Sequence, residues 1–559
     1  MKRLTYLVTS LFTTAAFGSS AAVASDQPDL ILTSNHVVTM TGSRSAEPLA
    51  VAIRGERISW VGPIEEIVHS DARIINLGDR ALLPGFIDAH GHAAYLAMTT
   101  QLANIAAPPV GPVEDVADLQ SVLRQYIKDK ALQPGEWVVG QGYDDSLLAE
   151  NRHPTRDDLD AVSTEHPIYL VHVSGHLAAA NSSALEIAGI TAESDNPPGG
   201  VIRRRAGSEE PNGVLEESAS YPLRQYMTAP VKDPLQSIQA AMAAYASYGI
   251  TTAQDGAASL ESIQLLQAAD ASDLVNLDVI MYPAAQRKPQ EMMDLEYGVY
   301  KGRVKLGGVK LMLDGSPQGK TAYMTEPYLK PPHGQSEDYR GYPAISQVRA
   351  NELVAQFGDA GIKMLAHANG DAAADMLINA VRAAKLTSDH RTVMIHAQTV
   401  REDQLTDMKT LNMIPSFFSA HSFYWGDWHR DSVFGHARAM RISPTASTVA
   451  RDMVFTLHND APIVPPDMIR LLWATTNRLT RSGQVLGANQ RISTYDAIRG
   501  ITSHAAYQHF EEADKGTIEI GKLADLVVLS QNPLSVPTAQ LMNIQVEATY
   551  SRGKPIFQR

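Results

Sequence analysis

The sequence contains no cysteine among its 559 residues, so a disulfide framework is excluded and no lipid-bearing cysteine follows the N-terminal segment. It also has no excess of basic residues. The formal net charge of −14 argues against a nucleic-acid-binding surface, which needs clustered Lys and Arg. Only 19% of the residues are charged and 44% are hydrophobic, which excludes global disorder and allows a large core.

Long apolar runs are missing except at the N-terminus. There Lys2 and Arg3 precede an apolar stretch over residues 4–17, and small residues end the segment at Ala24. This order predicts a signal peptide over residues 1–24 and a periplasmic or secreted protein. Because no other stretch approaches the length of a bilayer span, we expect a soluble mature chain with no membrane partner.

The two ends of the chain are rich in short strand-like runs, whereas the middle is not. Residues 25–83 and 511–559 therefore predict one small composite β-sandwich domain assembled from both termini. In residues 84–510, helical stretches such as 235–248 and 351–360 alternate with apolar runs. These runs lie at residues 83–87, 304–313, 362–366, 392–395 and 453–457.

Helices that alternate with apolar strands are typical of an α/β fold with a parallel sheet. At about 400 residues, a (β/α)₈ TIM barrel with insertions fits this middle part better than an open sheet. Residues 104–222 carry many Pro, Gly and charged residues. We interpret them as a large insertion that covers the site, with a separate domain of unrelated role as the alternative.

The strongest local motif is residues 84–92, Pro-Gly-Phe-Ile-Asp-Ala-His-Gly-His, in which an apolar strand ends in two histidines. The i and i+2 spacing of His90 and His92 places both imidazoles on one face of a strand, where they form a natural Zn²⁺ pair. A single His-x-His is a weak signal.

Its weight comes from recurrence, because three further apolar strands end in His367, His396 and Asp460. The carboxyl ends of barrel strands meet at one mouth, where the chemistry of such folds is found. Four strand ends with these side chains therefore predict a metal site that contains His90, His92, His367, His396 and Asp460.

With these motifs the chain resembles the amidohydrolase superfamily, in its YtcJ-like, N-substituted formamide deformylase-type branch (amidohydrolase family 3). The resemblance covers nearly the whole mature chain. Its other motifs are Val-Lys-Leu at residues 309–311, Asp-Gly-Ser at 314–316, Asp-Ala-Pro at 460–462, and Gly-Thr-Ile-Glu and Gly-Lys-Leu-Ala-Asp at 516–519 and 521–525.

The resemblance implies two divalent metal ions, which we expect to be Zn²⁺, with Mn²⁺ and Fe²⁺ left open. His90, His92 and Asp460 would hold one ion, and His367 and His396 the other. Lys310 would be a carbamylated lysine that bridges both, and Lys305 is the competing candidate. A neutral lysine amine can take up CO₂ and become an anionic oxygen donor.

Asp460 is expected to act as a base as well as a ligand, taking a proton from the attacking water and passing it to the leaving nitrogen. Deaminases of the superfamily carry a Glu three residues after the corresponding strand-end His, whereas this chain has Gly370 there. Hydrolysis of an open-chain or exocyclic C–N bond therefore fits better than ring deamination. Asp371 is expected to cap the helix that begins there.

Four further residues are weaker candidates. His421 is expected to stabilise an oxyanion or contact substrate, with an aromatic-packed loop histidine as the alternative. His172 and His176 are expected in a lid or pocket wall, and Asp314 beside Lys310 or substrate.

The sequence thus predicts a metal-dependent amidohydrolase that acts on a small molecule, an N-substituted formamide or N-acyl amine. Two alternatives stay open, namely an esterase or lactonase with the same site, and a secreted regulatory or binding protein on this fold. A homodimer is possible by resemblance. Metal content measured together with activity would separate these hypotheses.

Overall fold

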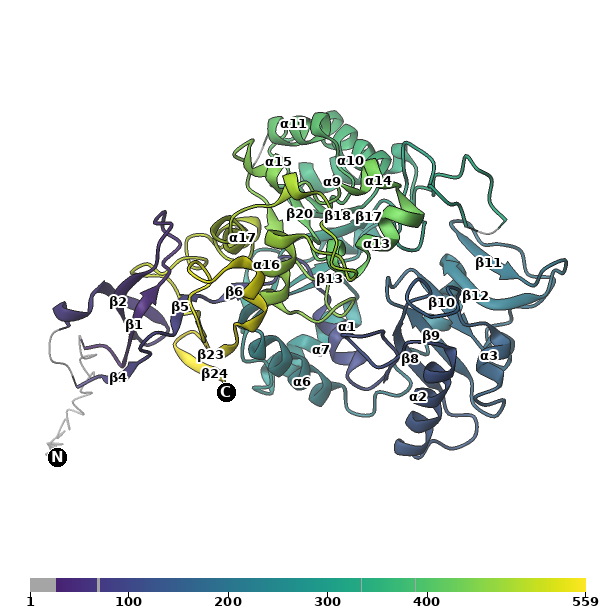
Figure 1. The fold of residues 1–559 in the computed structure, drawn as a ribbon, viewed down its shortest axis with the longest axis horizontal. Coiled ribbons are helices and arrows are strands. Elements are labelled where there is room, and N and C mark those ends of the chain that lie inside the picture. Colours follow the sequence, from purple (N-terminus) through teal and green to yellow (C-terminus); the bar gives the residue numbers. More distant parts are fainter. Residues whose placement is uncertain (1–26, 68–70, 333, 388) are drawn as a thin grey trace, which may run out of the picture.

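The computed structural model describes residues 27–67, 71–332, 334–387 and 389–559. The predicted signal peptide lies outside these ranges. Figure 1 shows a sheet from the two chain ends on one side, the central elements in the middle and the predicted insertion on the other side. None of the helices in the described ranges has the length and apolar character that a membrane crossing requires.

One sheet contains strands from both ends of the chain. In spatial order its strands are β24 (Lys554–Gln558), β23 (Val546–Ser551), β22 (Leu526–Leu529), β5 (Ala81–Pro84), β1 (Leu30–Val37), β2 (Glu47–Arg54) and β3 (Arg57–Pro63), with β4 (Arg73–Asn76) paired to β1. The two chain ends meet where β5 pairs antiparallel with β22. Fully buried Leu82, Val51 and Val528 belong to one apolar cluster of this sheet, which holds the two ends together.

The central elements form two five-stranded sheets. The first contains β15 (Tyr300–Lys301), β16 (Val304–Leu306), β14 (Asp278–Pro283), β13 (Ile250–Ala258) and β6 (Phe86–Ile87), in this spatial order. The second contains β17 (Val309–Met312), β18 (Met364–Ala368), β19 (Val393–His396), β20 (Ile414–Phe417) and β21 (Thr456–Leu457). All pairs except β15–β16 are parallel, and a bridge between Ala284 and Lys310 links the two sheets.

Helices lie between these strands along the chain. The longer ones are α6 (Pro234–Ser247), α7 (Leu260–Ala271), α9 (Gln347–Asp359), α10 (Asp371–Ala384), α11 (Glu402–Thr410) and α16 (Met468–Asn477). Helix α6 begins where its sequence indicates, because the Asp233 carboxylate accepts from the backbone N–H of Gln236 and Pro234 occupies the first turn. This parallel succession of strands and helices is the α/β class that the sequence predicts, and closure into a barrel stays a prediction.

The apolar run at residues 304–313 forms two strands, β16 and β17. β16 pairs with β14, whereas β17 pairs with β18. Gly307 and Gly308 separate the two strands, and a Cβ on Gly308 would lie 2.2 Å from the carbonyl oxygen of Lys363. The chain passes from one central sheet to the other at this close approach, which only glycine allows.

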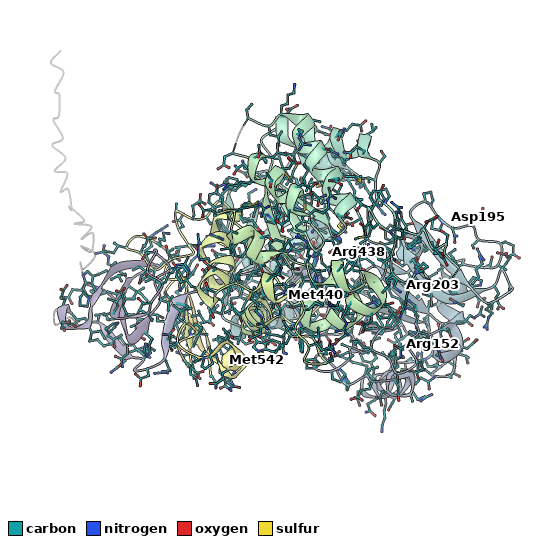
Figure 2. All side chains as sticks on the ribbon, turned by 45° about the horizontal axis from the view of Figure 1, so that its top comes forward. Arg152, Asp195, Arg203, Arg438, Met440 and Met542 are labelled. Atoms are coloured by element: carbon teal, nitrogen blue, oxygen red, sulfur yellow. The ribbon has the colours of Figure 1, made fainter. Side chains whose placement is uncertain are left out.

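The predicted insertion contains a six-stranded sheet. Its strands in spatial order are β11 (Gly200–Arg204), β12 (Pro211–Glu217), β10 (Leu177–Ala180), β9 (Ile168–His172), β8 (Val138–Tyr143) and β7 (Ala103–Asn104). Figure 2 labels Arg152 and Arg203 on this part of the molecule, at some distance from Met542 near the C-terminus. The indole N–H of Trp425 donates to Asp144 at 2.6 Å and so ties the insertion to the central elements.

A buried ionic network joins the first central sheet to the C-terminal segment. The Lys515 ammonium lies 2.7 Å from an oxygen of Asp278, at the start of β14, and 2.9 Å from an oxygen of Glu511. Glu511 also pairs with Lys305, and Asp278 with Arg552. Because Lys515 and Asp278 are almost completely buried, each charge depends on its partners.

Replacing Lys515 with methionine is expected to destabilise the fold by about 3–5 kcal/mol, because it leaves two buried carboxylates without a main partner. The measurement is the midpoint of urea unfolding. Lys288→Met is the matched control, since Lys288 forms an exposed pair with Glu291 and its loss should cost less than about 0.5 kcal/mol. Equal midpoints for the two variants would contradict a structural role for the network.

Candidate metal centre

All six predicted ligands line one cavity of about 540 Å³. They are His90 and His92 after β6, Lys310 on β17, His367 on β18, His396 on β19 and Asp460 after β21. They come from both central sheets, and all except Lys310, the second residue of β17, lie near or beyond the carboxyl end of a strand. The mouth of a closed barrel stays a prediction.

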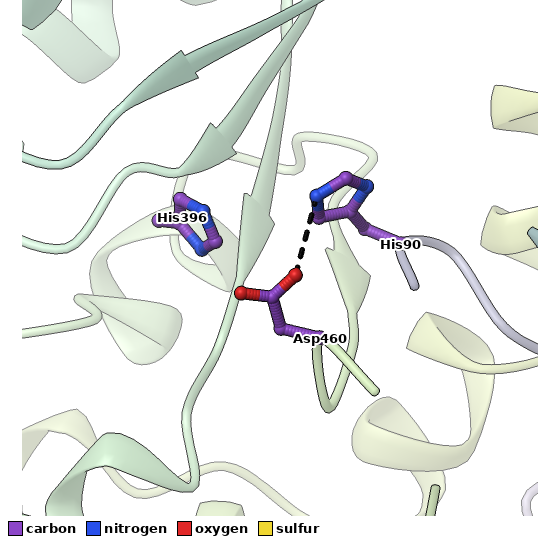
Figure 3. A group of neighbouring side chains, drawn as sticks. All are labelled: His90, His396 and Asp460. Atoms are coloured by element: carbon purple, nitrogen blue, oxygen red, sulfur yellow. Dashed lines mark ion pairs between the residues drawn. The ribbon is translucent and has the colours of Figure 1, made fainter. Parts of the chain in front are cut away.

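Three of these side chains converge most closely. Ligand atoms of His90, His396 and Asp460 all lie within 4.8 Å of one another, as Figure 3 illustrates. One oxygen of Asp460 lies 3.4 Å from Nε2 of His90 and 3.1 Å from Nε2 of His92. Imidazole nitrogens around a carboxylate oxygen are a donor set that Zn²⁺ accepts.

Neighbouring residues orient two of the imidazoles. Nδ1 of His90 lies 2.6 Å from Oε1 of Gln254, and with the proton on Nδ1 the lone pair of Nε2 faces Asp460. On the other side of the site, Nδ1 of His396 lies 3.2 Å from Nε2 of His458, whose Nδ1 lies 2.8 Å from the Ser416 hydroxyl. Such partners fix the tautomer of a metal-binding histidine and hold its ring in place.

Lys310, and not Lys305, faces this group. Its ammonium nitrogen lies 3.0 Å from Nε2 of His90, and burial lowers the pKa of Lys310 to about 7. A substantial fraction of the amine is therefore neutral near pH 7, which is the form that takes up CO₂. Lys305 belongs to β16 and pairs with Glu511 in the ionic network.

The Asp460 carboxylate is held in its charged form. Burial raises its pKa, but the hydrogen bond with His92 and the nearby rings of His396 and His90 together lower the pKa well below the usual range. Asp460 and His396 both have positive φ angles, 58° and 72°. Left-handed backbone at two non-glycine positions is energetically unfavourable and is typical of functional sites.

Asp314 supports the site through the backbone. Its carboxylate accepts from the N–H groups of Tyr323, Asn369 and Gly370 at 2.8–3.1 Å, and one oxygen lies 3.6 Å from Nε2 of His367. In the part of the chain that the structure describes, it forms no hydrogen bond with Lys310, and its expected role beside Lys310 or substrate stays a prediction. Its contacts instead hold the turn that follows β18, the strand that contains His367.

Helix α10 begins at Asp371 as expected, but Asp371 is its first residue and Gly370 is the N-cap. The expectation that Asp371 caps the helix is wrong, because among the described residues its carboxylate forms no capping hydrogen bond. It accepts from the backbone N–H and hydroxyl of Thr325 and pairs with Arg401. Gly370, at the position where deaminases have a Glu, has no side chain, and Asp371 interacts with Thr325 and Arg401.

His421 lies behind His396 and not in the cavity wall. Its ring centre is 6.3 Å from that of His396 and 4.1 Å from that of Phe418. The side chain is buried, and its Nδ1 has no hydrogen-bond partner in the described ranges. This position corresponds to the aromatic-packed alternative, and a contact between His421 and substrate stays a prediction.

The insertion contributes one wall of the cavity through His176 and Glu217. Nδ1 of His176 lies 3.0–3.1 Å from the Glu217 carboxylate, and its ring centre is 5.3 Å from that of His367. Burial lowers the pKa of His176, but Glu217 outweighs this effect and raises it overall. His172 instead pairs with Asp145 at 3.0 Å inside the insertion.

Sequence reasoning missed three residues of the cavity wall and one that contacts a ligand from outside the wall. Tyr221, Arg224 and Arg287 line the outer wall, and Gln254 on β13 orients His90. Tyr221 and Arg224 belong to helix α5 (Tyr221–Arg224), and Arg287 to the loop after β14. No motif or spacing marks them, because their proximity to the metal centre depends on how the insertion lies over the central strands.

Comparisons with known proteins identify the family of this chain. A model described as the Amidohydrolase family matches residues 73–557. The chain is 26% identical over 552 residues to N-substituted formamide deformylase from Arthrobacter pascens, covering 95% of this chain and 98% of that protein. It is 24% identical over 503 residues to putative amidohydrolase YtcJ from Bacillus subtilis (strain 168), covering 87% and 90%.

Among solved structures, an uncharacterized metal-dependent hydrolase from Pyrococcus horikoshii superposes with a TM-score of 0.71 at 22% identity. The match covers 91% of this chain and 99% of that one. At this identity the likeness concerns the fold alone.

Proposed function

Because the chain belongs to the amidohydrolase family, whose model matches most of its length, we propose that it hydrolyses an amide-type C–N bond of the N-substituted formamide or N-acyl amine class. The predicted family is thereby confirmed. The observation that carries the proposal is the convergence of His90, His396 and Asp460 beside Lys310 in one cavity. We further propose that the two central sheets are halves of a (β/α)₈ barrel and that the chain is exported.

The donor set fits two divalent cations, which we propose to be Zn²⁺. His90, His92 and Asp460 would hold one, His367 and His396 the other, and carbamylated Lys310 both. When bound, the cations would acidify a water molecule and polarise the carbonyl of the substrate.

The remaining steps belong to the protein side chains. The charged Asp460 carboxylate would accept a proton from the attacking water and pass it to the leaving nitrogen. Gln254 and His458 would keep the ligand rings oriented throughout. The wall formed by His176 and Glu217 would limit the access of bulk water to the reacting carbonyl.

We expect the purified protein to contain about two divalent ions per chain, and removal of the ions by a chelator to abolish amide hydrolysis reversibly. His396→Ala should lower the metal content to about one ion, because the second ion loses one of its two imidazoles. The measurements are elemental analysis and turnover of N-formyl and N-acyl amines, esters and lactones.

His436→Ala is the matched control, since His436 is exposed and does not line the cavity. It should leave both metal content and turnover unchanged. The proposal fails if the protein holds less than about one ion per chain after incubation with Zn²⁺. It also fails if esters or lactones are the only compounds in the panel that are hydrolysed.

A further inference from the structure

Two arginines lie over one tyrosine ring at the outer wall of the catalytic cavity. The guanidinium carbon of Arg224 is 4.6 Å from the ring centre of Tyr221, and that of Arg287 is 4.4 Å from it. All three side chains line the cavity that contains His90, Lys310 and Asp460. Two cations and an amphipathic ring therefore face the same space as the proposed metal centre.

Neither arginine is neutralised by a carboxylate in the ranges that the structure describes. Arg224 donates to the carbonyl oxygen of Gly175 at 3.1 Å, and Arg287 contacts the Tyr221 ring. The nearby Glu217 is already engaged by His176. Other arginines of this chain, such as Arg203 with Glu216, form close ion pairs.

Both arginines are exposed, so water screens much of the repulsion between their charges. The Tyr221 ring helps to hold them side by side, because a guanidinium over an aromatic face is attracted by the ring quadrupole. Their N–H donors remain accessible to a ligand in the cavity. A guanidinium presents a planar fork of N–H donors that matches an oxyanion such as a carboxylate, often through two parallel hydrogen bonds.

We propose that Arg224 and Arg287 recognise an anionic group of the substrate, and that the substrate is therefore an N-acyl or N-formyl amine that also carries a carboxylate. This inference rests on the proposed function. Water adds to the acyl carbon, the C–N bond breaks, and the leaving nitrogen gains the proton. The carboxylate takes no part in these steps. Its recognition at the outer wall places the amide toward the metal centre.

The test compares a matched pair of substrates with the Zn²⁺-loaded enzyme: N-formylphenylalanine, as both enantiomers, and its neutral amide, N-formylphenylalaninamide. We expect kcat/KM to be about 10- to 100-fold higher for the acid, as charge-assisted hydrogen bonds imply. Arg287→Met and Arg224→Met should each remove most of this preference by raising KM for the acid, so that kcat/KM falls much further for the acid than for the amide.

Three controls sharpen the result. Arg349→Met removes a half-buried arginine of α9 outside the cavity and should change kcat/KM for neither substrate. Arg287→Lys keeps the charge but not the fork, and should retain only part of the preference. The phosphonate analogue of N-formylphenylalanine distinguishes recognition of a carboxylate from recognition of any oxyanion, and a preference for the phosphonate would overturn the carboxylate assignment.

The inference is overturned if wild-type enzyme prefers the amide, or if the arginine variants change both substrates equally. Turnover of the neutral amide alone would leave the proposed function standing and remove this inference. If the metal-loaded protein hydrolyses neither compound, the wider panel of N-formyl and N-acyl amines still tests the proposed function, and calorimetric binding of N-formylphenylalanine tests this inference separately. If the double variant Arg224→Met/Arg287→Met no longer binds N-formylphenylalanine, anion recognition is supported. Equal binding by this variant and the parent enzyme would exclude it.

Discussion

Replacing Asp460 with asparagine is expected to lower kcat by about 1,000-fold or more, because the change removes the proposed proton acceptor and weakens one metal site. Asparagine keeps the size of the side chain but carries no negative charge beside His90 and His92. The measurement is kcat for the best N-acyl or N-formyl amine, together with metal content. We expect kcat to fall far more than the metal content does.

Asp467→Asn is the matched control for this change. Asp467 is the N-cap of α16 and accepts from the backbone N–H of Arg470, a role that asparagine can also fill. Its kcat should stay within about twofold of the parent value. If Asp460→Asn loses its metal completely and regains full kcat when the metal is restored, Asp460 is a ligand only and the base role is wrong.

Replacing Lys310 with alanine is expected to give the second large effect, with kcat reduced about 1,000-fold and the metal content lowered. The substitution removes the proposed bridge and leaves space beside Nε2 of His90, where the lysine nitrogen lies at 3.0 Å. Small carboxylates such as acetate should enter this space and restore part of the activity, because they supply the two oxygen donors of a carbamate.

The parent enzyme provides the internal control, since acetate should not activate it. Metal-free parent enzyme reloaded in CO₂-free buffer should stay inactive until bicarbonate is added, because the carbamate forms from CO₂ and a neutral amine. The lowered pKa of Lys310, to about 7, means that this recovery needs no alkaline buffer. Full recovery in CO₂-free buffer would show that Lys310 acts uncarbamylated.

Five of the six proposed ligands could be predicted because they follow apolar runs, whereas Lys310 lies inside one and is assigned through the family resemblance. Parallel strands present their carboxyl ends on the same side, so His367, His396 and Asp460 are brought near His90 by the strand order alone. The choice between Lys305 and Lys310 could not be made in this way. It depends on Gly307 and Gly308, where the run divides into strands of two different sheets.

The sequence by itself determined the family, the α/β class and the strand ends that carry the proposed ligands, because local periodicity and motif spacing encode these features. Only the tertiary structure decided which side chains complete the cavity and which orient the proposed ligands. Gln254 reaches His90 across 164 positions of sequence, and Arg224 and Arg287 meet over one tyrosine from two different parts of the chain. Such contacts depend on how packed elements lie against each other, and no local pattern of residues records that.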